Sequence, residues 1–389
     1  MIAIISNRSR PDYGKVIVPL PIPDEQYDQV IEKLESFKIG DFRACDCHVN
    51  ELTECPPVLK CLESEQVNID ELDYLIKRLD SFVPSELASF SALTVKYNLT
   101  EMTDLINLSY CCQNALAVTD FSDMSNIGRG YALAQNGGCM ATDELNSINL
   151  VVLAQKLLSG KSGTVTPYGV LYDEGFSLES IYDGTMLPPY YYKPGLVNVQ
   201  VITEKDPDNC PEFTLPVPEK QMIRTLKRVG YQEGDSHMIV KLDSELPAEI
   251  AEGLCTRAED VFSLNRAVAA IARLDQSQYE KFAAAVDYAH PQTPEQYQKL
   301  AESLDMFDFI PGAQDADDVG RHMILESGHF EVDPNLEDYI DFEAYGRDHM
   351  RGGEGKFGEY GFIAYTGDER LDFGTENKQT IGQRMGGMT

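Results

Sequence analysis

The sequence predicts an α+β protein in which one arrangement of strands and helices occurs twice along the chain. Three observations carry this prediction. Short β-branched runs alternate with segments of helical apolar spacing. The motif VPLPIPDEQ at 18–26 returns as FTLPVPEKQ at 213–221. A glycine-rich hairpin pattern also occurs twice, as GTVTPYGVLYD and GKFGEYGFIAY.

Each copy is predicted to begin with a strand, a helix and a second strand. The runs MIAIIS and LVNVQVIT predict the opening strands because they are rich in β-branched residues. Pro23 and Pro218 suit a first helical turn, and Gly40 and Gly230 suit a helix end. The runs FRACDCHV and HMIVKL predict the strands that follow.

Helical segments continue the parallel at an offset near 195 residues. NIDELDYLIKRLD (68–80) matches SLNRAVAAIARLD (263–275), NIGRGYALAQNGG (126–138) matches DVGRHMILESGHF (318–330), and LNSINLVVLAQKL (145–157) matches LEDYIDFEAYGRD (336–348). Matches in one order along the chain indicate an internal duplication. We therefore predict a first module at 1–175, a second module at 196–366, and a flexible, polar tail at 367–389. The segment between the modules, 176–195, is rich in Pro and Tyr and is expected to be a linker that packs on a neighbouring surface.

The charge balance limits the ligands. Sixty-four acidic residues against 32 basic ones give a net charge of −32. This excess disfavours nucleic acid or an anionic membrane as a direct ligand, and it favours a basic partner. Nine irregularly spaced cysteines and the absence of an 18-residue apolar run predict a cytoplasmic protein with free, mostly buried thiols.

The acidic residues are most concentrated between positions 305 and 348. This stretch holds 13 acids and only two bases, Arg321 and Arg347. Apolar residues remain interleaved with the acids, so the charge is expected on folded elements rather than on a disordered tail. We predict one helix that begins at Asp333-Pro334 and ends at Gly346. Its predicted inner face consists of Leu336, Tyr339, Ile340 and Ala344.

Three motifs could carry other chemistry, and each has a plainer interpretation. SGKSGT (159–164) lacks the first glycine of a phosphate loop, because Gln155 stands there, so a hairpin turn is favoured. Cys45, Cys47 and His48 could bind zinc, but a small buried core on one strand face explains them too. The stretch from Asp315 to Glu326 partly fits a calcium loop, and a helix start capped by Asp317 or Asp318 is the alternative. No HExxH or GxSxG motif is present, so we predict neither catalytic residues nor a metal or cofactor.

The end of the second module resembles a known family. YIDFEAYGRDHM followed by GEGKFGEYGFIAY is similar to the C-terminal signature of the ArdA antirestriction family, with Tyr345, Gly346, Arg347 and Asp348 at its centre. SLNRAVAAIARLD, an acidic helical stretch and DVGRHMI precede it in the family's order. The first module resembles the family only through the repeat, and NLVVLAQKL stands where the signature would be.

The resemblance implies an elongated, acidic DNA mimic rather than an enzyme. Such a protein occupies the DNA-binding groove of type I restriction-modification enzymes and blocks them competitively. A charge of −32 equals the phosphates of about 16 base pairs, or about 54 Å of duplex. It further implies a homodimer, or an intrachain pseudo-dimer of the two modules. The alternative is an acidic calcium-binding or scaffold protein of a mobile element. The predicted partner-binding surface consists of Asp305, Asp308, Asp315, Asp317, Asp318, Glu326, Glu331, Asp333, Glu337, Asp338, Asp341 and Glu343.

Overall fold

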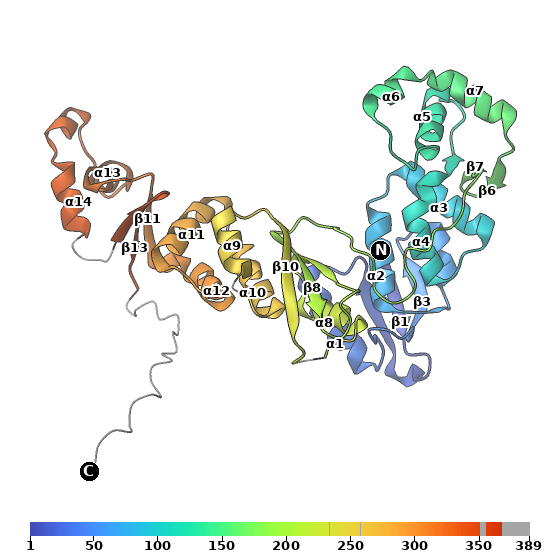
Figure 1. The fold of residues 1–389 in the computed structure, drawn as a ribbon, viewed down its shortest axis with the longest axis horizontal. Helices are drawn as coiled ribbons and strands as arrows, with labels where there is room; N and C mark the ends of the chain where they lie inside the picture. The colour runs from blue at the N-terminus through green and yellow to red at the C-terminus, as the bar shows by residue number, and fades with distance from the viewer. Residues whose placement is uncertain (233, 257, 351–354, 368–389) are drawn as a thin grey trace, which may run out of the picture. The chain divides into compact units, whose positions relative to one another are not determined.

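The computed structural model describes residues 1–232, 234–256, 258–350 and 355–367, and it confirms the α+β class (Figure 1). The chain forms two compact units. Unit 1 comprises Met1–Pro194 and Gln200–His237, and unit 2 comprises Gly195–Val199 and Met238–Thr389. The two modules predicted from the sequence remain a prediction. Of the predicted tail at 367–389, the described residues include only Gly367.

Unit 1 begins with an antiparallel sheet of order β2-β1-β3-β4. The strands are β1 (Ile2–Ser6), β2 (Lys15–Pro19), β3 (Cys47–Thr53) and β4 (Gln66–Val67). Helix α1 (Asp24–Ser36) follows β2 and buries Tyr27, Val30, Ile31 and Leu34 at helical spacing. The predicted strand FRACDCHV begins later than expected, at Cys47, so Cys45 is exposed before the strand and does not share a strand face with the buried Cys47.

Helices continue unit 1, and a second sheet of order β5-β7-β6 follows them. Asn68 caps α2 by accepting hydrogen bonds from two backbone N–H groups, as a helix start at this position requires. One hydrophobic core extends from Ala3 to Tyr182, which lies within residues 176–195. The elements are a 3₁₀ helix (Pro57–Leu62), α2 (Ile69–Asp80), α3 (Pro84–Tyr97), α4 (Met102–Cys111), β5 (Leu116–Val118), α5 (Met124–Ala134), α6 (Thr142–Ser147), α7 (Leu150–Gly160), β6 (Thr164–Thr166) and β7 (Gly169–Tyr172).

The predicted second module begins with a sheet of order β10-β8-β9, formed by β8 (Val197–Thr203), β9 (Glu212–Leu215) and β10 (His237–Ser244). Helix α8 (Glu219–Arg228) follows β9, as α1 follows β2. Unit 2 then contains α9 (Ala248–Thr256), α10 (Val261–Ile271), α11 (Gln276–Ala289), α12 (Pro294–Glu302), β11 (Phe307–Pro311), α13 (Ala316–Arg321), a π-helix (His322–Glu326), a 3₁₀ helix (Pro334–Tyr339), α14 (Phe342–Met350), β12 (Gly355–Gly358) and β13 (Gly361–Tyr365).

The last sheet, of order β11-β13-β12, has the strand order of the β5-β7-β6 sheet. In both sheets a glycine-containing turn joins the last two strands, so both predicted hairpins are confirmed. Among the residues described, no helix combines the length and apolar character needed to cross a membrane.

Candidate partner-binding surface

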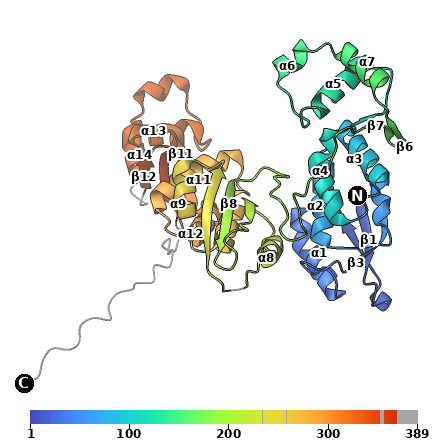
Figure 2. The same cartoon turned by 45° about the vertical axis from the view of Figure 1, so that its right-hand side comes forward.

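The acidic stretch of unit 2 is built on a close helix pair, α13 and α14 (Figure 2). A Cβ atom added at Gly320 would lie 1.9 Å from the carbonyl oxygen of Phe342. A Cβ atom added at Gly346 would lie 1.9 Å from the carbonyl oxygen of Ala316. The two backbones therefore touch, and only glycine fits on each side of the contact. Gly346 lies buried inside α14, so its predicted role as a helix stop is wrong.

The predicted single helix from Asp333 to Gly346 is also wrong. Asp333 does cap a helix, accepting a hydrogen bond from the Asn335 backbone N–H at 3.0 Å, but this is the short 3₁₀ helix. Tyr339 and Leu336, which were expected to face inward, are 86% and 55% exposed. The α-helix begins anew after Asp341, whose carboxylate accepts from the Ala344 backbone N–H at 3.0 Å.

Arg321 ties three segments of this region together. Its Nε lies 2.6 Å from an Asp317 carboxylate oxygen on α13, and its Nη1 lies 3.6 Å from Glu337 on the 3₁₀ helix. Its guanidinium also lies 4.5 Å from the ring centroid of Phe342, the first residue of α14. The hydrogen bond that Arg321 donates to the Asp317 carboxylate raises the pKa of the guanidinium. Arg347 of the signature forms an ion pair with Glu343 within α14.

The twelve predicted surface carboxylates are all exposed or half-buried, and the structure divides them into three groups. Four accept hydrogen bonds from backbone N–H groups: Asp315, Asp318, Asp333 and Asp341. Four pair with a basic side chain: Asp317, Glu326, Glu337 and Glu343. Four make no hydrogen bond or ion pair within the described part of the chain: Asp305, Asp308, Glu331 and Asp338.

The stretch from Asp315 to Glu326 is helical rather than a calcium loop. Asp315 is the helix cap, in place of the predicted Asp317 or Asp318. The carboxylate of Asp318 in turn accepts from the Gln314 backbone N–H at 2.9 Å. From Ala316 to Glu326 the backbone forms α13 and the π-helix, so these side chains do not converge on one point. Within the described ranges, no three Asp, Glu, His or Cys side chains are placed to hold a metal ion.

The predicted first module contains a similarly close helix pair with far fewer acids. A Cβ atom at Gly128 on α5 would lie 1.9 Å from the carbonyl oxygen of Leu150 on α7, which corresponds to the Gly320–Phe342 contact 192 residues later. Asn149 caps α7 where Asp341 begins α14. At the same offset Leu145, Val151 and Lys156 replace Glu337, Glu343 and Asp348. Residues 113–156 hold four acids and two bases, against 13 and two at 305–348, so one backbone arrangement carries two different surfaces.

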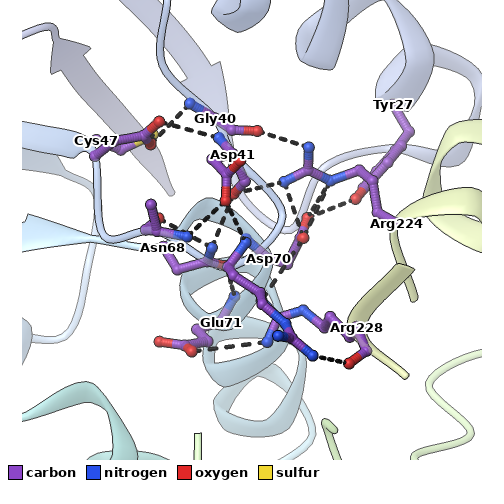
Figure 3. A network of polar contacts seen from close by, with 12 residues as sticks. Tyr27, Gly40, Asp41, Cys47, Asn68, Asp70, Glu71, Arg224 and Arg228 are labelled. Atoms are coloured by element: carbon purple, nitrogen blue, oxygen red, sulfur yellow. Dashed lines mark hydrogen bonds and ion pairs between the residues drawn. The ribbon is translucent and has the colours of Figure 1, made fainter. Parts of the chain in front are cut away.

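A second polar feature, within unit 1, was not predicted from the sequence (Figure 3). Arg224 on α8 is only 7% exposed, yet every donor group of its guanidinium is engaged. Its Nε lies 3.0 Å from both carboxylate oxygens of Asp70, and its Nη atoms donate to the carbonyl oxygens of Gly40 and Asp41 at 2.6 and 3.2 Å. Such a buried ion pair requires this degree of hydrogen bonding to offset desolvation.

Arg228, one turn later on α8, is 3% exposed. Its guanidinium donates to Asn68 Oδ1 at 2.7 Å and to the hydroxyl of Tyr182 at 3.2 Å. The Tyr182 hydroxyl donates to Glu71 Oε1 at 2.7 Å. Burial raises the pKa of Glu71, against the opposing effects of Tyr182 and Arg228. Nothing in the local sequence of α8 distinguishes these arginines from surface ones, because their partners lie far away along the chain.

Comparison with known proteins bears on the C-terminal part of the chain. No curated protein sequence matches the chain. The family described as Antirestriction protein (ArdA) matches residues 212–364. The match begins in β9 and includes α8, the α13–α14 pair and the final hairpin. The C-terminal part of this chain, residues 212–364, therefore carries a match to the ArdA antirestriction family.

Proposed function

We propose that this protein is an antirestriction protein that imitates duplex DNA and occupies the DNA-binding groove of a type I restriction-modification enzyme. The single observation that carries the proposal is the α13–α14 region, where twelve exposed or half-buried carboxylates lie inside the family match. A groove that binds DNA is basic, because B-DNA carries one charge per about 1.7 Å of its axis. An acidic surface is attracted to the same groove without any catalytic step.

The eight carboxylates that accept a hydrogen bond or form an ion pair and the four that do neither have different roles in this proposal. Capping hydrogen bonds and ion pairs hold eight of the carboxylates in place, so the charge array is ordered before binding. An ordered array does not lose that conformational freedom on association. The untied carboxylates, Asp305, Asp308, Glu331 and Asp338, have no partner among the described residues to give up. We therefore expect these four to meet the basic side chains of the enzyme.

We further propose that the chain arose by tandem duplication and that only the second copy retains the DNA-like charge. The equal sheet orders and the equivalent glycine contacts of α5–α7 and α13–α14 support the duplication. The nearly neutral balance of 113–156 supports a first copy that does not bind the groove through its helix pair.

Inhibition of a purified type I restriction enzyme, measured with increasing duplex DNA and over a salt series, tests the proposal. The parent protein should compete with DNA and lose affinity steeply as salt rises. The variant D305N/D308N/E331Q/D338N should bind at least about tenfold more weakly, with a shallower salt dependence, because it removes four attractive charges.

The matched control removes four exposed carboxylates from the first copy, in the variant E51Q/E65Q/D143N/E144Q. This control should change the inhibition constant less than about twofold. Equal losses in the two variants would mean that only overall acidity matters, as in a scaffold protein. If added duplex DNA did not relieve inhibition, the proposed binding in the DNA-binding groove would be wrong.

A further inference from the structure

Helix α8 follows the first two strands of the second copy in sequence but is part of unit 1. It corresponds to α1 at an offset of 195 residues, and the apolar positions agree: Met222 and Leu226 are buried, as are Tyr27 and Ile31. The other face differs. Gln29 and Lys33 are exposed on α1, whereas the corresponding Arg224 and Arg228 are buried on α8. The helix face that is exposed on α1 is therefore buried and charged on α8.

We infer that Arg224 and Arg228 of α8 bind the N-terminal part of the second copy to the first copy; we call this contact the lock. The polar surface of the first copy fits only a helix that carries arginines at these two positions. The receiving surface consists of the carbonyl oxygens of Gly40 and Asp41 with the side chains of Asn68, Asp70 and Glu71. Together these groups present acceptors that match the planar, five-donor guanidinium.

The lock works in one direction only. The structure shifts the predicted match of 68–80 with 263–275 by three residues. Helix α10, capped by Asp260, corresponds to α2, capped by Asn68, and most of the buried positions of the two helices agree at an offset of 192 residues. Phe262 and Ser263 then stand where Asp70 and Glu71 stand. The second copy therefore lacks the two carboxylates that receive the arginines, and α1 has Gln29 and Lys33 where α8 has Arg224 and Arg228. One α8 engages one first copy, and the contact cannot propagate into a chain of copies.

Removal of one partner should cost far more than removal of both. In R224Q the carboxylate of Asp70 loses its closest buried cation, and in D70N the guanidinium of Arg224 loses its carboxylate. In D70N/R224Q neither charge remains. Contacting charges that depend on one another give non-additive effects in such a cycle.

The test is amide hydrogen exchange of the full chain in the three variants, followed on α8 and on α10. R224Q should accelerate exchange across α8 by at least about tenfold and leave α10 unchanged. The combined variant should exchange at least about fivefold more slowly than the product of the two single effects predicts. The control K227Q removes an exposed cation of α8 and should accelerate exchange less than about threefold.

Additive effects in the cycle would overturn the lock, as would unchanged exchange in R224Q. If R224Q yields no folded protein, the cycle still decides: a folded D70N/R224Q supports the coupling, and an equally unfolded one contradicts it.

Discussion

Single glycines set the geometry of the acidic surface. Gly320 and Gly346 are not required for an unusual backbone angle, since neither has a positive φ. They are required because α13 and α14 touch through their backbones. The family signature thus contains a packing glycine, and the carboxylates of α14 owe their placement to it. Arg347 of the same signature forms its ion pair at the surface.

Gly346→Ala should destabilise unit 2. The new methyl group would lie 1.9 Å from the carbonyl oxygen of Ala316, and no flexible side chain can move to relieve the clash. Forcing the helices apart should lower the free energy of unfolding by about 1–3 kcal/mol, as measured by urea denaturation. Gly160→Ala is the control, because a Cβ atom there meets no atom within 4 Å; its effect should stay within about 0.5 kcal/mol. Equal urea midpoints for the two variants would contradict the close contact.

At the scale of elements, caps decide where the helices of the acidic stretch begin. The 3₁₀ helix buries no side chain, so it has no packing energy to extend it past Tyr339. The Asp341 carboxylate then caps the start of α14, and Phe342, the next residue, is buried. The break cannot be seen in the periodicity of the sequence, because Tyr339 and Ile340 fit the apolar stripe of a longer helix.

A comparison of Asp341→Ala with Asp338→Ala separates the cap from the charge. Both variants lose one exposed carboxylate, but only Asp341 accepts a backbone hydrogen bond. Asp341→Ala should cost about 1 kcal/mol of unit 2 stability, whereas Asp338→Ala should stay within about 0.5 kcal/mol. Urea denaturation measures both values. If Asp338→Ala is the more destabilising of the two, the helix boundary at Asp341 is wrong.

Rules based on neighbouring residues predicted some caps and turns correctly. They failed where a residue's role depends on residues far away in the sequence. The cap at Asp333 and both hairpins depend on neighbouring residues, and the structure confirms them. The predicted surface carboxylates are accessible for the same reason, since acids outside ion pairs stay in water. Gly346 and Arg224 were misjudged or missed, because each has its role through a residue at least 26 positions away. The glycine shared by the two copies, at 128 and 320, was the one available signal of a helix crossing.

At the scale of the whole molecule, the charge of −32 acts on the fold and on the proposed complex in opposite ways. Like charges at the surface repel one another and destabilise the folded chain, and salt screens this repulsion. Salt equally screens the attraction between an acidic surface and a basic groove. The buried pair of Arg224 and Asp70 is shielded from salt by the protein around it, so it should respond little.

Raising NaCl from about 0.05 to about 0.5 M, a range over which the screening length falls severalfold, should therefore raise the melting temperature while it weakens inhibition. Calorimetry of the free protein and the inhibition assay measure the two effects under one set of buffers. In D305N/D308N/E331Q/D338N both slopes should be smaller, because four carboxylates leave the most acidic stretch of the chain. A melting temperature that falls with salt would show that favourable surface ion pairs, such as Arg321 with Asp317, outweigh the repulsion among the excess acids.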